Sequence, residues 1–193
     1  MLTTLALIAA LHAAPDPLPP TRTEEGMYVY HVADAQGRRD VLALLSPEQA
    51  QQRGGLPPPA IVGALKTRLD QGGEVSADNL VVNEAMVRFL HGFIARTAPT
   101  LQAAQAAAQG AQARGDRWLN YYDGRWDRQQ APVNEDLIGV FEVVDGAIRA
   151  ESYRDNAGAH RILSASGLFR LDPELHARYI EALMAEPVNA GGP

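Results

Sequence analysis

Cysteine is absent from the 193 residues of this chain. The absence excludes disulfides, thiolate nucleophiles, zinc–cysteine sites and iron–sulfur clusters together. Because no Gly-x-Gly occurs, the dinucleotide-binding fingerprint is also missing, and there is no Walker loop, no His-Glu-x-x-His and no Asp-rich calcium loop. The segment Ser164–Gly167 comes nearest to a Gly-x-Ser-x-Gly elbow, but it lacks the first glycine. We therefore predict no cofactor.

Positive charge is scarce as well. The formal net charge is −6, whereas a protein that binds a polyanion is normally basic, so we do not expect a nucleic-acid partner. The five histidines stand far apart, at positions 12, 31, 91, 160 and 176. Metal ligands usually come from neighbouring positions on one helix or on paired strands. We therefore predict no metal site.

Charged residues are missing from Met1–Ala14, and a proline-rich stretch follows over residues 15–26. An uncharged apolar run of this length is typical of a secretory signal and too short to span a bilayer. We predict a signal peptide over residues 1–14, an extended linker over 15–26, and a periplasmic or secreted protein. No later apolar stretch reaches the length of a membrane span, so we expect none in the mature chain.

Two features of a secretory signal are absent from this leader. It has no positively charged start, and the best cleavage site, Leu11-His12-Ala13, has leucine where a small residue is preferred. The alternative is an N-terminal helix that docks on the core of a cytosolic protein, because apolar residues recur every third position at Leu2, Leu5, Ile8 and Leu11. The frequent Ala, Gly, Pro and Arg are typical of a GC-rich bacterial genome.

The remaining chain predicts an α+β fold in which an antiparallel sheet of hairpins packs with about four to five helices. We expect one domain over residues 27–186 and a disordered tail over 187–193, since this length is ordinary for one domain. Alternating and β-branched segments with turn residues between them predict hairpins, at 27–45, at 118–122 with the residues after Asp123-Gly124, at 137–153 and at 160–171.

Helices are predicted where capping residues precede an apolar stripe. Ser46-Pro47-Glu48-Gln49 has the pattern of a capping box. The further helices are expected after Pro57, with Ile61, Val62, Leu65 and Leu69 on one face, after Asn83, after Pro99, and after Asp172-Pro173. The helix over 101–113 is mostly Ala and Gln, and it should be peripheral because alanine buries little apolar area.

Aromatic residues are few, at 6% of the chain, and four of them gather within nine residues. Tyr and Trp combine a large apolar area with a polar group, and arginine stacks on them, so such a cluster is suited to gripping a peptide or a sugar. The alternative is a hairpin whose rings pack across the strands. We predict a binding site at Trp118, Tyr121, Tyr122, Arg125 and Trp126, with Arg125 as a polar clamp.

A second cluster of polar residues lies between Ser152 and Arg161. Polar residues on a loop that a hairpin supports are often functional, and Ser152, Asp155 and His160 are weak candidates for a hydrolase site with His160 as acid or base. The alternative is a solvated loop that turns at Asp155-Asn156.

Three functions follow from these patterns. The first is an exported bacterial binding domain whose ligand is a protein, a peptide or a glycan. The second is a hydrolase that uses the Ser152–Arg161 loop, and the third is a cytosolic structural or regulatory protein. The sequence leaves the ligand, the oligomeric state and the question of enzymatic activity open.

Overall fold

A computed structural model describes residues 21–23, 26–34, 37–126, 131–164 and 166–188. The structure is a mixed α and β protein whose sheets are all antiparallel, which confirms the predicted class in outline. The described residues form two compact units: the first contains those up to Val87 and those from Arg178 onward, and the second contains those of Arg88–Ala177. The predicted signal peptide over 1–14 lies outside the described residues, and the single domain over 27–186 stays a prediction.

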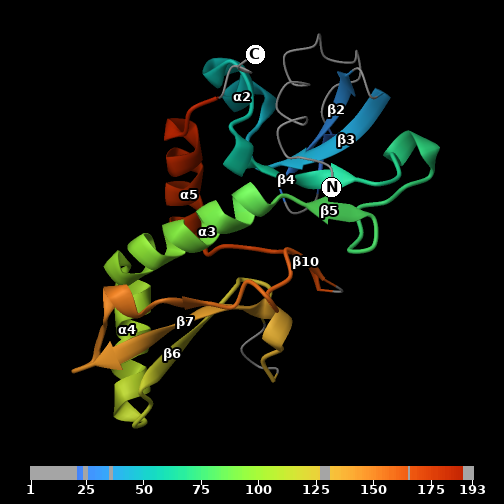
Figure 1. Cartoon of the computed structure of the whole chain (residues 1–193). Helices are drawn as coiled ribbons and strands as arrows, with labels where there is room; N and C mark the ends of the chain where they lie inside the picture. The colour runs from blue at the N-terminus through green and yellow to red at the C-terminus, as the bar shows by residue number, and fades with distance from the viewer. Residues whose placement is uncertain (1–20, 24–25, 35–36, 127–130, 165, 189–193) are drawn as a thin grey trace. The chain divides into compact units, whose positions relative to one another are not determined.

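The first unit contains a five-stranded sheet in the order β1-β2-β3-β4-β5 (Figure 1). Its strands are β1 (Thr21–Arg22), β2 (Tyr28–Asp34), β3 (Gly37–Ala43), β4 (Ile61–Leu65) and β5 (Leu80–Val82). The β2–β3 hairpin was predicted, but β3 begins earlier than its apolar residues because pairing continues to Asp34 opposite Gly37. Thr21–Arg22 fell within the predicted linker and instead pair with β2.

The helix predicted after Pro57 is wrong. A short 3-10 turn at Pro58–Ala60 leads directly into strand β4, which lies between β3 and β5. A continuous apolar run such as Ile61–Leu65 fits a buried strand as well as a buried helix, so the pairing on both sides decides its conformation. Gly63 permits the close approach of β5, because a Cβ atom there would lie 2.3 Å from the Val81 carbonyl oxygen.

The capping predictions are confirmed at two helices. Helix α2 (Pro47–Arg53) begins with the Ser46–Gln49 capping box and ends at Gly54, which has φ of +72°. Helix α3 (Glu84–Thr97) begins after Asn83, whose side-chain oxygen accepts from the Ala85 amide at 3.0 Å. The predicted apolar stripe of α3 is buried, at Met86, Leu90, Phe93 and Ile94.

The second unit contains a smaller sheet in the order β6-β7-β8, with β9 also paired to β7. Its strands are β6 (Trp118–Tyr122), β7 (Leu137–Val144), β8 (Ala147–Ile148) and β9 (Arg154–Asp155). The β7–β8 hairpin was predicted from Asp145-Gly146, and both residues have positive φ, as a tight primed turn requires. Of the hairpin predicted around Asp123-Gly124, the first strand forms as β6 and pairs with β7, and residues 127–130 of the second arm lie outside the described residues. A short hairpin of β10 (Leu163–Ser164) and β11 (Gly167–Leu168) confirms the predicted pair around Ser166-Gly167.

Helix α4 (Gln102–Ala113) lies alongside β6, β7 and β8 in this unit (Figure 1). It buries one face of small residues, Ala104, Ala108 and Ala111, and this lets the helix approach the sheet closely. Helix α5 (Pro173–Ala185) begins at Asp172, whose carboxylate accepts from the Leu175 amide at 3.0 Å. Single 3-10 turns connect the elements, at Leu69–Gln71, Ala98–Thr100, Asn134–Asp136 and Ala150–Ser152.

Candidate functional site

A groove of about 940 Å³ opens in the second unit beside strand β6. The edge of α4 forms one wall, through Ala103, Ala107 and Gly110, and the whole of β6 forms the other. The segment Arg170–Asp172 and Leu175 line it as well. The four aromatic residues predicted as a binding site, Trp118, Tyr121, Tyr122 and Trp126, all line this groove.

Strand β6 is an edge strand, because it pairs with β7 on one side and with no other described strand. Trp118 lies opposite Glu142 and Asn120 opposite Val140. The Val143 amide donates to the Arg117 carbonyl at 2.8 Å, which makes Arg117 and Val143 a hydrogen-bonded pair. Hydrogen-bonded and non-bonded pairs alternate in an antiparallel ladder.

The alternation fixes the direction of each backbone group in β6. Leu119 and Tyr121 bond to β7, whereas the amide and carbonyl groups of Trp118 and Asn120 point away from it. No described residue provides a partner for these outward groups. The groove therefore runs along an edge whose backbone donors and acceptors are unpaired within the described part of the chain, and such an edge is a template for another strand.

The two faces of β6 differ in chemistry. Leu119 and Tyr121 lie on the face that packs toward the core, where the Tyr121 ring meets the buried Phe141 edge-on, with ring centres 6.1 Å apart. The Tyr121 hydroxyl lies 3.4 Å from the Asp172 carboxylate, and burial raises the pKa of this tyrosine. An occupant of the groove would meet apolar surface on this side.

The opposite face carries the other aromatic residues. The Arg154 guanidinium lies 4.8 Å from the centre of the Trp118 ring, and the rings of Tyr122 and Trp126 pack with their centres 4.4 Å apart. Glu142 lies between Arg117 at 2.7 Å and Arg149 at 3.0 Å, and its pKa is lowered first by the hydrogen bond from Arg117. This face is polar and half-exposed.

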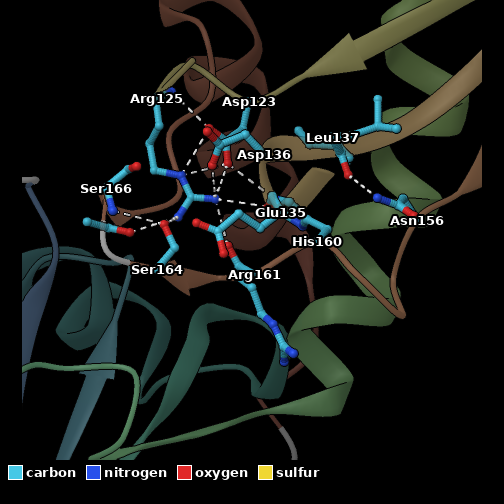
Figure 2. Close-up of polar contacts among 12 residues, drawn as sticks. Asp123, Arg125, Glu135, Asp136, Leu137, Asn156, His160, Arg161, Ser164 and Ser166 are labelled. Carbon is cyan, nitrogen blue, oxygen red and sulfur yellow. Dashed lines mark hydrogen bonds and ion pairs between the residues drawn. The ribbon is translucent and has the colours of Figure 1, made fainter. Parts of the chain in front are cut away.

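Arg125, predicted as a polar clamp for a ligand, is buried instead, with a side chain only 1% exposed. Figure 2 shows its guanidinium surrounded by protein acceptors. It pairs with Asp123 at 2.6 Å and with Asp136 at 3.0 Å. It also donates to the Ser164 hydroxyl at 2.9 Å and to the carbonyls of Gly167, at 2.8 Å, and Arg161, at 2.7 Å.

These contacts make the turn after β6 part of a closed network. Arg125 joins it to the β10–β11 hairpin and to the start of β7, so the guanidinium positions Tyr122 and Trp126 at the end of the groove. A buried arginine that reaches five acceptors keeps no donor for a ligand.

The network buries two carboxylates beside one guanidinium. Burial raises the pKa of Asp136, and the nearby Arg125 partly offsets this effect. The His160 ring completes the cluster, since its Nε2 atom lies 3.2 Å from Asp123 and its side chain is 1% exposed (Figure 2). Removing one member of such a buried network lowers the free energy of unfolding by roughly 3–5 kcal/mol.

The structure does not bring together the three residues of the predicted hydrolase site. The Ser152 hydroxyl donates to the Arg149 carbonyl at 2.5 Å and accepts from the Glu142 amide at 2.7 Å. Asp155 caps a turn by accepting from the Ala157 amide, and His160 contacts Asp123. Each side chain thus has a separate local partner, and the hydrolase stays a prediction.

No family, curated protein or solved structure matches this chain. Within the described residues, no helix is both long and apolar enough to cross a membrane. In the same part of the chain, no group of three or more His, Asp or Glu side chains is arranged to hold a metal ion.

Sequence reasoning located the aromatic wall of the groove and missed the other wall. The signal for that wall was the small-residue stripe of Ala103, Ala107 and Gly110, next to the stripe that α4 buries. The free edge of β6 left no signal in the sequence, because it depends on which distant strand pairs with which.

Proposed function

We propose that this protein binds an extended peptide segment, which adds a strand to the free edge of β6. The observation that carries the proposal is the pair of outward-facing backbone groups at Trp118 and Asn120, directly beside a groove. Strand addition to a sheet edge is a common mode of peptide recognition, in which main-chain hydrogen bonds give affinity and flanking pockets give specificity. A free peptide and an extended segment of a larger protein present the same backbone to β6.

The dimensions and the walls of the groove support a strand as the occupant. An added strand would lie about 4.8 Å from β6. The groove has a volume of about 940 Å³, which is near the upper limit of the roughly 300–1,000 Å³ found for ligand sites. Ala103, Ala107 and Gly110 leave this space open because they have almost no side chain. The Trp118 ring already contacts the Arg154 guanidinium, and the rings of Tyr122 and Trp126 contact each other. A sugar would need a free ring face for stacking, so these contacts favour a peptide.

A groove-filling substitution tests the proposal. Ala107→Leu places a large side chain in the groove from an exposed helical position, and Ala106→Leu is its matched control, exposed on the same helix but outside the groove. Both substitutions keep a strong helix former, so α4 should be preserved. Phage-displayed random nonapeptides are selected on the full chain and then measured on each variant.

We expect wild type and Ala106→Leu to enrich and bind the same peptides, and Ala107→Leu to bind them about tenfold or more weakly. Two N-methylated versions of a selected peptide are then compared, one methylated at the odd-numbered backbone amides and one at the even-numbered amides. Only one version should bind more weakly, because only alternate amides of an added strand face β6. Equal binding to all three proteins, or equal binding of both methylated registers, would exclude strand addition at this edge.

A further inference from the structure

The walls of the groove also restrict the sequence of the occupant. Resting on the proposed function, we infer that it binds segments of the form acidic–apolar–x–apolar, antiparallel to β6. Here x is the residue that pairs with Asn120, and the acidic residue lies toward Arg170. The register, the chemistry of the two faces and an arginine that has no counterion among the described residues carry this inference.

The register places the two apolar residues. In an antiparallel pair, the residue opposite Asn120 directs its side chain to the same face as Asn120. The residues before and after it lie opposite Tyr121 and Leu119, on the face toward α4. Most of their surroundings are apolar or small, at Leu101, Ala103, Ala107, Leu119, Leu171 and Leu175, and the Asp172 carboxylate at this wall lies 3.4 Å from the Tyr121 hydroxyl. Two bulky apolar side chains fill this wall, and burying each favours binding in proportion to its apolar area.

The central residue meets a different environment. Its side chain lies beside Trp118, Asn120 and Tyr122, on the half-exposed face where Asn120 donates to the Tyr122 hydroxyl at 3.4 Å. This position tolerates many residues because it stays in contact with solvent, so specificity resides in its two neighbours.

The position of the acidic residue follows from the arginines at the two ends of the groove. At the other end of the groove, Arg114 pairs with Asp116 at 2.9 Å, Arg117 pairs with Glu142 at 2.7 Å, and the Arg154 guanidinium stacks on the Trp118 ring. Arg170 lines the groove and is exposed, and its guanidinium has no partner among the described residues. The Gly124 amide donates to the Arg170 carbonyl at 2.7 Å, which places the Arg170 backbone near the Tyr122 end of β6.

The orientation follows from that position. In an antiparallel occupant, the residue opposite Tyr122 comes before the apolar pair, so the acidic side chain precedes it in sequence. Antiparallel pairing is also slightly more stable per residue than parallel pairing. A segment with the reversed order would place its carboxylate opposite Trp118, away from Arg170, where the Arg154 guanidinium already stacks on the Trp118 ring.

Fluorescein-labelled peptides test the inference on the full chain. The probe is Gly-Ser-Glu-Leu-Thr-Leu-Ser-Gly, and its comparison peptides replace both Leu with Ala, replace Glu with Gln, or reverse the central order to Leu-Thr-Leu-Glu. We expect about tenfold or greater weakening for the Ala peptide and for Ala107→Leu. We expect roughly threefold weakening for the Gln peptide, the reversed peptide and the variant Arg170→Gln, the size of an exposed ion pair. The Gln peptide should bind wild type and Arg170→Gln equally well.

Equal binding of all four peptides, or no binding of the probe, would overturn the inference. These outcomes separate it from the proposed function. Peptides of other sequences that bind wild type and lose binding in Ala107→Leu would leave strand addition intact, whereas a library that enriches no such peptide removes both.

Discussion

The two main sheets of this protein end in different ways. In the first unit the edge strands are short, with two residues in β1 and three in β5. The Leu80 amide, which points away from β4, donates a hydrogen bond to the Ser76 carbonyl at 3.0 Å. In the second unit, β6 has five residues, and its outward backbone groups at Trp118 and Asn120, beside the groove, have no partner among the residues that the structure describes. Short or covered edges prevent unwanted pairing, so the exception at β6 is where a partner strand is expected.

The polar links of the two units differ as well. In the first unit Asp40 accepts from the Leu69 amide at 2.7 Å and contacts His31 at 2.8 Å, and the His31 side chain keeps 16% of its surface exposed. In the second unit Arg125, Asp123, Asp136 and His160 are all nearly fully buried. The second unit thus depends on charges that have no access to water, and this makes it more sensitive to substitution and to pH.

Removing the central guanidinium should have the largest effect. Arg125→Leu leaves Asp123 and Asp136 buried without their cation, and we expect a loss of about 3–5 kcal/mol in the free energy of unfolding. Urea denaturation measures it. Asp40→Ala in the first unit should cost less, about 1–3 kcal/mol. Arg117→Ala, whose side chain is 74% exposed, should change stability by no more than about 0.5 kcal/mol. An Arg125→Leu cost as small as that of Arg117→Ala would show that the network does not hold the turn.

Acid should weaken the second unit through His91. This ring is buried, with Nδ1 2.8 Å from the Tyr153 hydroxyl and its centre 6.1 Å from that of His160. Burial lowers its pKa below 6.5, and the charges of Asp155 and His160 act in opposite directions on it. The unfolded chain therefore takes up a proton first as the pH falls through 6.5, so stability is full above this pH and declines below it.

We expect Tm to fall by a few degrees between pH 7.5 and 5.5, and His91→Gln, which keeps a partner for Tyr153, to remove most of this decline. The raised pKa of Asp136 acts in the opposite direction and is present in both proteins, so it cancels in the comparison. Parallel Tm curves for the two proteins would contradict the role of His91.

The smallest effect concerns the free edge itself and needs no substitution. Amide hydrogen exchange in the protein without peptide should be about tenfold or more faster at Trp118 and Asn120 than at Leu119 and Tyr121, because only the latter pair bonds to β7. In β5, Leu80 should exchange slowly because its amide is bonded. Uniform protection along β6 would mean that its edge is covered in solution.

Local chemistry made several elements predictable. The Ser46–Gln49 capping box, the Asn83 cap and the Asp145-Gly146 turn each act within a few residues, and all three form as expected. The segment after Pro57 was predicted as a helix because Ile61, Val62, Leu65 and Leu69 fall on one helical face. Residues Ile61–Leu65 instead form β4, because they pair with β3 on one side and β5 on the other.

The candidate site shows the same division. The aromatic residues were visible as a cluster, and the structure places four of them on one groove. Arg125 was expected at the surface because arginine is rarely buried without partners. Its partners come from residues 123, 136, 161, 164 and 167, which are too dispersed to be associated by sequence pattern.

The sequence by itself determined the Asp145-Gly146 turn, the helix caps and the apolar stripe of α3, because these depend on residues close in the chain. Only the tertiary structure decided that β6 pairs with β7 on one side, that its other side faces the small residues of α4, and that Arg125 is enclosed. The physical reason is that strand pairing and charge burial join distant residues, and the groove exists only where those choices leave backbone groups unpaired.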